Sequence, residues 1–295
     1  MIEFIQLLVQ GISLGACYAL LALAFAIVFR ASHVLNFAQG AMLLLGAYLV
    51  SYFAVDRALP FGLAVAGAMA ALIALGVAFH RVVLVRLAGA PEFIFIMVTL
   101  GAGIVITATV ELFFGPNGRQ LGDPWGSKAL AIGAVTSNQV RLWAVVVTVV
   151  TLTAYFVFER RTTYGLATRA AAMDQEAAAA VGVPVRRTQS IAWAFAAFLS
   201  VLGGIFLAGY PNSVHMSLGD AALRAFPAVI VGGLGSPVGA VVGGLSIGII
   251  EVMVAGYAPP WTGANANAVA PYVAMMVLLV IRPHGLFGTP ATSRV

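Results

Sequence analysis

A long apolar stretch near the start of the chain, FIQLLVQGISLGACYALLALAFAIVF at residues 4–29, decides the class of fold. It contains no charged residue, and it exceeds the roughly 20 residues that cross a hydrocarbon core of about 30 Å as an α-helix. No basic segment and no small-residue cleavage site precede it, so a cleaved signal peptide is not indicated. The stretch predicts a transmembrane helix that stays in the mature protein.

Similar apolar runs continue along the chain, near residues 37–55, 61–79, 92–114, 141–159, 191–210, 237–256 and 269–281. Of the 295 residues, 62% are hydrophobic and 8% are charged, with a mean hydropathy of +1.03, whereas roughly a quarter of residues are charged in soluble domains. The alternating segments of about ten residues that are typical of a membrane β-barrel are absent from the sequence. We predict an all-α polytopic membrane protein with about eight to nine transmembrane segments, one of them broken, in a single domain over residues 1–295.

The positive charges indicate how the chain is oriented. Arginines concentrate at residues 80–92 and 160–190, and two predicted spans separate these segments, so both lie on one side. The positive-inside rule makes that side cytoplasmic. Topology thus accounts for the net charge of +5, and no nucleic-acid partner is expected. Residues 115–140, dense in Gly, Pro and Asn, then form the longest extracytoplasmic loop.

Within residues 160–190 the sequence predicts a short polar helix, TRAAAMDQEAAAAVG at residues 168–182. Thr168 is the candidate N-cap, Ala170–Ala180 are good helix formers, and Gly182 ends the helix. Its small alanines would let another protein approach closely, and specific contacts would come from four side chains: Arg169, Met173, Asp174 and Glu176. The alternative is a helix lying on lipid headgroups, but such helices carry a large apolar face. The sequence favours docking to a partner protein.

Polar residues interrupt the apolar pattern at the start of the second predicted span, SHVLNFAQGAMLLLGAY at residues 32–48. Asn36, Phe37 and Gln39 stand at or just inside the membrane edge, where amide groups need a protein partner or water. One hypothesis is a helix broken at Asn36–Gly40 that lines a translocation cavity. The other is an ordinary hydrogen bond between helices, and the sequence does not decide between them.

A second interruption divides AFPAVIVGGLGSPVGAVVGGLSIGIIE, residues 225–251, into two apolar pieces at Gly232, Gly233, Gly235 and Pro237. Irregular backbone at membrane depth must be buried in protein or face water, and broken helices that meet near the midplane occur in transport sites. Glycines also let unbroken helices pack closely, but the adjacent proline favours a break. We expect both interruptions to lie close together along a solute path.

The sequence gives no support for catalysis or metal binding in this chain. No P-loop and no HExxH motif is present, and the four histidines and the single Cys17 show no metal-ligand spacing. We therefore expect no catalytic residue, metal site or cofactor. The apolar runs hold two acids, Glu111 and Glu251, both close enough to an interface to be hydrated, whereas an ion-coupled carrier would be expected to show more. With so few charges in its spans, the pathway should bind its solute weakly.

Four motifs follow one another along the chain: GISLGACYALLALAFAIVFRASHVLNFAQGAMLLLGAY (11–48), RAAAMDQEAAAAVGV (169–183), FPAVIVGGLGSPVGAVVGGL (226–245) and RPHGLFG (282–288). In this order, over nearly the whole chain, they resemble the permease subunits of branched-chain amino-acid ABC importers of the LivH type. The resemblance implies an ABC importer permease fold in which the polar helix couples the permease to an ATPase. Gln39 stands where the family often has histidine, so a role in protonation is excluded there.

The resemblance also implies partners and a location. A second permease subunit of related type, two cytoplasmic ATPase subunits that bind ATP and Mg, and a periplasmic solute-binding protein would complete an importer in the bacterial inner (plasma) membrane. The solute would be a branched-chain amino acid or a related small polar or carboxylate solute. Relatives carry urea, short amides or aromatic acids, so the binding protein is expected to set most of the selectivity. The alternatives are an ion-coupled secondary transporter of small solutes and, more distantly, an intramembrane enzyme.

Overall fold

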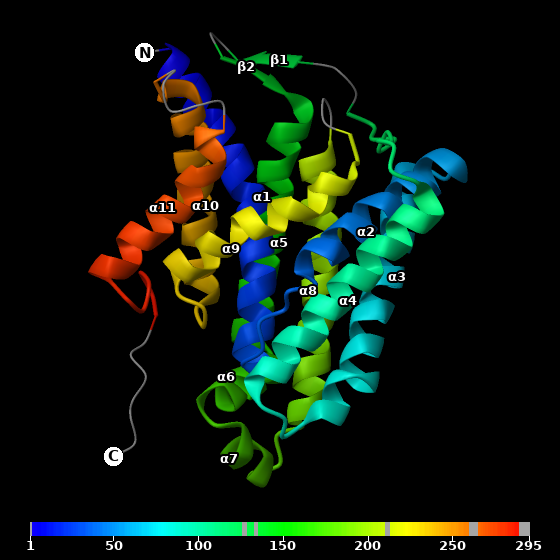
Figure 1. Ribbon diagram of the computed structural model, residues 1–295, viewed down its shortest axis with the longest axis vertical. Helices are drawn as coiled ribbons and strands as arrows, with labels where there is room; N and C mark the ends of the chain where they lie inside the picture. The colour runs from blue at the N-terminus through cyan, green and yellow to red at the C-terminus, as the bar shows by residue number, and fades with distance from the viewer. Residues whose placement is uncertain (1, 126–128, 133–134, 210–212, 260–264, 289–295) are drawn as a thin grey trace.

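The computed structural model describes residues 2–125, 129–132, 135–209, 213–259 and 265–288, which form a helical bundle (Figure 1). The elements are α1 (Ile2–Ser32), α2 (Gln39–Ser51) with a π-helical continuation (Tyr52–Asp56), α3 (Phe61–Val82), a 3-10 turn (Leu84–Leu87), α4 (Glu92–Phe114), β1 (Ala129–Ile132), β2 (Val135–Asn138), α5 (Gln139–Arg161), α6 (Thr163–Met173), α7 (Gln175–Ala180), α8 (Val185–Ala208), a 3-10 turn (Met216–Gly219), α9 (Asp220–Gly232), α10 (Pro237–Tyr257) and α11 (Ala266–Ile281). The two short strands pair antiparallel.

Among the described helices, seven are long and apolar enough to cross a membrane: α1, α2 with its continuation, α3, α4, α5, α8 and α10. Helix α11 is shorter, with 16 residues. Helix α9 has 13 residues and is the first piece of the broken segment. The predicted all-helical multi-pass architecture is confirmed, because these helices match the apolar runs and include the broken one.

Helix α1 forms the core of the bundle. It packs against α10, α8, α5 and α9, and the stretch Gly15–Val28 is buried throughout. Small residues bring α1 and α10 together: a Cβ on Gly248 would lie 2.3 Å from the Cα of Gly15, and one on Gly244 would lie 2.5 Å from the Cα of Ala19. Close approach of this kind supplies the van der Waals contact that holds helices together in lipid. Gly244 and Gly248 of α10 therefore serve close packing with α1.

The two ends of the bundle differ in charge. The N-terminus and the β1–β2 hairpin lie at one end, and α6 and α7 lie at the other (Figure 1). The last turns of α1, α3 and α5 carry Arg30, Arg81 and the pair Arg160 and Arg161, and they point toward the α6 and α7 end. The positive-inside rule predicts that this end is cytoplasmic.

The extracytoplasmic loop is fastened to α2 and its continuation. Arg119 forms an ion pair with Asp56, and the Ser51 hydroxyl donates a hydrogen bond to the carbonyl of Gln120 at 2.7 Å. Further along, the β1–β2 hairpin occupies part of this loop, while residues 126–128 and 133–134 of the predicted loop lie outside the described residues. Arg119 and Gln120 thus hold the first part of the loop against α2 and its continuation.

Candidate functional site

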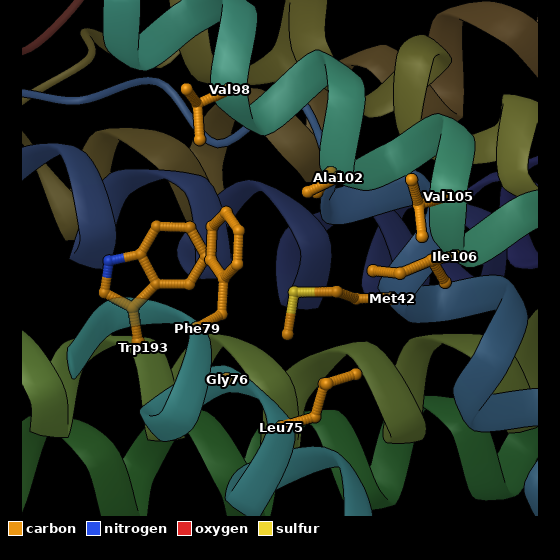
Figure 2. A pocket seen from close by; sticks show the side chains of 10 residues that line it. Met42, Leu75, Gly76, Phe79, Val98, Ala102, Val105, Ile106 and Trp193 are labelled. Carbon is orange, nitrogen blue, oxygen red and sulfur yellow. The ribbon is translucent and has the colours of Figure 1, made fainter. Parts of the chain in front are cut away.

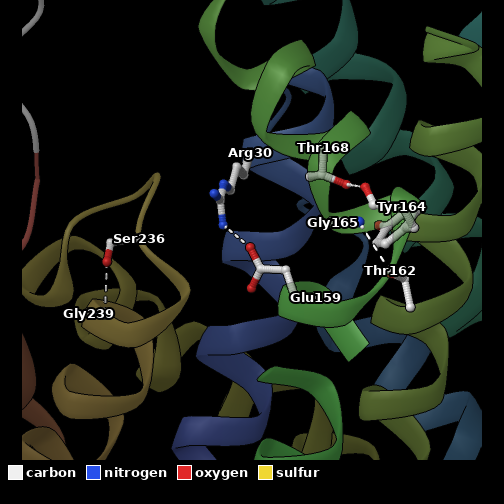
Figure 3. A network of polar contacts seen from close by, with 8 residues as sticks. All are labelled: Arg30, Glu159, Thr162, Tyr164, Gly165, Thr168, Ser236 and Gly239. Carbon is white, nitrogen blue, oxygen red and sulfur yellow. Dashed lines mark hydrogen bonds and ion pairs between the residues drawn. The ribbon is translucent and has the colours of Figure 1, made fainter. Parts of the chain in front are cut away.

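The cytoplasmic segment between α5 and α8 contains two helices, α6 and α7, in place of the single helix predicted, and Asp174 separates them. The prediction of Thr168 as the N-cap is wrong. Thr168 lies inside α6, where its hydroxyl donates to the carbonyl of Tyr164 at 2.9 Å. Thr162 caps α6, its hydroxyl accepting a hydrogen bond from the amide of Gly165 at 3.4 Å (Figure 3). The helical segment therefore begins earlier than expected and is broken once.

Asp174 causes the break between α6 and α7. Its carboxylate accepts hydrogen bonds from the backbone amides of Glu176 and Ala177, both at 3.0 Å, so it is the N-cap of α7. A short acidic side chain competes with the helix for its backbone amides, and here it takes the backbone out of the helical conformation. Gly182 follows the end of α7 as predicted, with a φ of +88° that favours glycine.

The outer surface of α6 and α7 holds both apolar and charged side chains. Met173 is 90% exposed and Leu166 is 64% exposed, and their spacing of seven residues places them on one face of α6. Glu176 is exposed, whereas Arg169 and Asp174 are half-buried. Of the four predicted docking residues, Met173 and Glu176 are therefore the two that are exposed. The surface is more apolar than the alanine-rich sequence suggested.

Two polar contacts link the cytoplasmic end of α1 to its neighbours, one to α5 and one to α7. Arg30 at the end of α1 pairs with Glu159 of α5 at 2.5 Å, and both side chains are largely buried (Figure 3). Gly165 of α6 lies directly against Glu159, because a Cβ there would come within 1.6 Å of the Glu159 carbonyl oxygen. On α7, the side-chain amide of Gln175 contacts Nδ1 of His33 at 3.2 Å. The end of α1 is thus in contact with α7 through Gln175 and is linked to α6 through Glu159.

An aromatic cluster adds to this attachment. The Tyr164 ring of α6 lies 5.4 Å from the Phe158 ring of α5 and 6.1 Å from the Phe195 ring of α8. Burial among these rings raises the pKa of Tyr164 to about 12, so its phenol stays neutral at physiological pH. Helix α6 is thus held by packing as well as by the polar contacts.

The first predicted interruption lies between α1 and α2, where residues 33–38 are not helical. The Asn36 side-chain amide donates to the Gln39 side-chain carbonyl at 3.0 Å, and the Gln39 amide donates to the Ser200 hydroxyl of α8 at 2.7 Å. Both Asn36 and Gln39 are buried. In this conformation the amides make the hydrogen bond between helices that was the alternative hypothesis, and their place on a solute path stays a prediction.

The second interruption is a sharp turn between α9 and α10. Gly233 has a φ of +101°, which favours glycine, and its carbonyl accepts a hydrogen bond from the amide of Ser236 at 2.9 Å. The Ser236 hydroxyl caps α10 by accepting from the amide of Gly239 at 3.0 Å (Figure 3). Pro237 takes the first position of α10, where a missing N–H leaves no hydrogen bond unmade. The break expected in this run is therefore present.

The C-terminal motif RPHGLFG, residues 282–288, covers the end of α9. The amide of Leu286 donates to the carbonyl of Val231 at 2.8 Å, and the amide of Phe287 donates to the carbonyl of Gly232 at 3.0 Å. The last carbonyls of a helix have no partner inside it, and an unsatisfied backbone group at membrane depth is costly. The motif therefore supplies hydrogen bonds that the broken helix needs.

Helix α9 connects the two interruptions. The ring of Phe37 lies 5.9 Å from the ring of Phe226 in α9. Gly232 follows Phe226 by six residues, about 9 Å along the helix axis. Gly235, at the tip of the glycine turn, is exposed. Phe37 therefore contacts the middle of this short helix, and the glycine turn lies at its end.

An apolar cavity of about 320 Å³ lies between α2, α3, α4 and α8 (Figure 2). Its lining includes Met42, Phe79, Ile106 and Trp193. It also includes Ala38, so it adjoins the turn that carries Asn36 and Gln39. Such a lining offers contact to an aliphatic group rather than hydrogen bonds to a polar one.

A polar cluster between α1, α9 and α10 was missed from the sequence. The Tyr18 hydroxyl donates to Oε2 of Glu251 at 2.7 Å, and a terminal nitrogen of Arg224 contacts Oε1 of Glu251 at 3.3 Å. Glu251 is 4% exposed, so the expectation that it is hydrated at an interface is wrong. Arg224 precedes the apolar run that defined the predicted span. Helix α9 nevertheless includes Arg224, because it begins at Asp220, four residues before the arginine. The one signal in the sequence was Glu251 itself, because an acidic residue within an apolar span usually pairs with a cationic side chain.

A multi-pass helical bundle with a broken helix and a fastened cytoplasmic segment defines a membrane transport protein of the permease class. The chain belongs to the family described as branched-chain amino acid transport system / permease component, whose model matches residues 7–281. The family assignment made from the four motifs is thereby confirmed.

Several known proteins are similar to the chain over almost its whole length. The high-affinity branched-chain amino acid transport system permease protein LivH of Salmonella typhimurium is 27% identical, and that of Escherichia coli is 26% identical, with 99% of this chain and 98% of each relative covered. The corresponding protein BraD of Pseudomonas aeruginosa is 24% identical with the same coverage. A solved structure, PsaBC from Streptococcus pneumoniae in complex with Fab, aligns with 97% of this chain and 92% of its own, at 13% identity and a TM-score of 0.45.

Proposed function

We propose that this chain is the permease subunit of an ATP-binding-cassette importer that moves branched-chain amino acids, or a related small carboxylate solute, across the bacterial inner membrane. Family membership and the named function of the relatives support the solute class. The observation that carries the ATP-driven mechanism is the cytoplasmic segment α6–α7, which presents Met173 and Glu176 outward while it is fastened to α1.

The geometry suggests how such a permease is driven. Helices α6 and α7 dock into a groove of a cytoplasmic ATPase, and closure of the ATPase pair on ATP moves them. The Arg30–Glu159 ion pair and the Gln175–His33 contact pass that displacement to α1. Because α1 packs against α9 and α10, the displacement reaches the broken helix. The spans then alternate between inward-open and outward-open arrangements.

The complete importer requires other chains. A second permease of related type would form the other half of the pathway, and a periplasmic binding protein would deliver the solute. Two ATPase subunits would bind ATP and Mg, so this chain itself would hold no cofactor. An ion-coupled secondary transporter is less favoured, because the buried acid Glu251 is paired with Arg224 and is not free to carry a coupling ion.

The proposal is tested by reconstituting the permease pair and the ATPases in vesicles with ATP inside and the loaded binding protein outside. Uptake of radiolabelled leucine is expected only with ATP and binding protein together, and an ATPase variant that cannot hydrolyse ATP is the matched control. Uptake that persists without ATP and stops when an ionophore removes the ion gradient would instead establish the secondary transporter. Parallel assays with urea, a short amide and an aromatic acid define the solute class.

A further inference from the structure

Three helices bring an arginine, a glutamate and a tyrosine together inside the bundle. Arg224 is in α9, Glu251 in α10 and Tyr18 near the middle of α1. Glu251 uses both carboxylate oxygens, one with the Tyr18 hydroxyl at 2.7 Å and one with Arg224 at 3.3 Å. The carboxylate is therefore fixed by two partners from two different helices.

The two charged side chains differ in exposure. Only 5% of the Glu251 side chain is exposed, compared with 42% of the Arg224 side chain. A guanidinium has five N–H donors in one plane, and the ion pair with Glu251 uses one terminal nitrogen. Arg224 is thus anchored on its buried side while further donors remain accessible on the other.

The accessible side of Arg224 lies on a helix that lipid is not expected to cover there. A charged side chain within a membrane segment faces the bundle interior or a water-filled cavity rather than lipid. The exposed part of Arg224 is therefore expected to face a hydrated path, or the subunit that encloses it.

We propose that Arg224 binds the carboxylate group of the transported solute, and that Glu251 and Tyr18 are positioning residues that orient its guanidinium. This inference rests on the proposed function, and it adds a selective site to a pathway that the sequence suggested was weakly binding. The planar fork of an arginine matches both oxygens of a carboxylate.

The test must separate solute binding from a purely structural ion pair. R224Q alone would leave Glu251 buried without its cation, which is strongly destabilising. The double variant R224Q/E251Q removes both charges and is expected to fold, because no buried charge is left unpaired. E251Q keeps the Arg224 side chain but removes the carboxylate that holds its guanidinium in place. R57Q is the matched control, because it removes an arginine from the extracytoplasmic end, where Arg57 contacts Tyr52.

The measured quantity is leucine uptake per ATP hydrolysed in the reconstituted vesicles, at saturating loaded binding protein. R224Q/E251Q is expected to lower this ratio about tenfold, the loss expected for a charge-assisted hydrogen bond, while ATPase stimulation by the binding protein is retained. E251Q is expected to lower the ratio about threefold or less, and R57Q is expected to leave it unchanged.

A charge swap provides the decisive comparison. R224E/E251R restores an ion pair between α9 and α10 but moves the cation to the buried position. If the swap or R224Q/E251Q transports leucine at the wild-type ratio, the ion pair is structural and the proposal is overturned. A wild-type complex that does not transport leucine contradicts the proposed function instead, which distinguishes the two failures.

Discussion

The backbone amide of Phe287 donates a hydrogen bond to the carbonyl of Gly232 at 3.0 Å, so the C-terminal segment completes the end of the broken helix. The backbone amide of the preceding residue, Leu286, donates in the same way to the carbonyl of Val231. Through these bonds the last carbonyls of α9 have partners in the protein.

Gly285→Ala should destabilise the protein because the C-terminal segment depends on this glycine. Gly285 has a φ of +76°, and a Cβ there would lie 2.6 Å from the carbonyl oxygen of Ile230. Backbone strain and the clash together are expected to cost about 1–3 kcal/mol, measured as a lower thermal unfolding midpoint in detergent. Gly101→Ala is the control, because a Cβ at this helical glycine meets nothing within 4 Å. Equal midpoints for the two variants would contradict the assigned contact.

Gly248→Ala should loosen the contact between the core helix and α10. The added Cβ would lie 2.3 Å from the Cα of Gly15, so the two backbones must separate. Overpacking of this kind costs about 1–3 kcal/mol, and the same unfolding measurement reports it. Gly62→Ala, where a Cβ meets nothing within 4 Å, is expected to have little effect. The packing argument fails if Gly248→Ala is as stable as the wild type.

The spans and the break could be predicted from the sequence because both signals are local. A run of apolar residues defines a span by its length, and Ser236 with Pro237 marks the start of α10 directly after the glycines. The two helices of the cytoplasmic segment were not predicted, because the alanine run outweighed the capping ability of Asp174. The N-cap of α6, Thr162, lies six residues before the predicted start of the helix at Thr168.

The remaining contacts could not be predicted because they depend on how distant segments meet. The role of the C-terminal motif follows only when residues 286 and 287 are placed against the end of α9. Arg224 was outside the apolar run, since an arginine lowers local hydropathy even when a buried Glu251 compensates its charge. The bond from Gln39 to Ser200 likewise joins helices that are far apart along the chain.

Gln39→Ala should destabilise the bundle through unsatisfied polar groups. It removes the partner of the buried Asn36 amide and of the Ser200 hydroxyl, at an expected cost of about 1–3 kcal/mol. Ser200→Ala should cost less, and the double variant should show a coupling energy of about 0.5–1.5 kcal/mol in a double-mutant cycle of denaturant unfolding. Thr109→Ala, which removes an exposed hydrogen bond within α4, is the control. Strict additivity of the two changes would show that the bond contributes nothing.

Charge reversal on α7 should weaken association with the ATPase. Glu176→Arg places a cation on the exposed surface of the segment that is expected to dock, and it leaves the capping bonds of Asp174 intact because these go to backbone amides. Copurification of tagged permease with the ATPases is expected to fall about tenfold, the effect of replacing an attractive charged contact by a repulsive one. Asp174→Arg should do the same but also removes the N-cap, which costs about 1 kcal/mol. Asp174→Asn separates the two effects, because it keeps a capping oxygen and loses only the charge.

Glu92→Arg is the matched control for these reversals, since Glu92 is exposed at the start of α4 on the same end of the bundle but outside the α6–α7 segment. It should insert into the membrane and copurify with the ATPases like the wild type. If Glu92→Arg reduces copurification as much as Glu176→Arg does, the loss reflects the general charge of the cytoplasmic face. If Glu176→Arg and Asp174→Arg both copurify and transport normally, the assignment of α6–α7 as the coupling segment is wrong, or these two side chains face away from the ATPase.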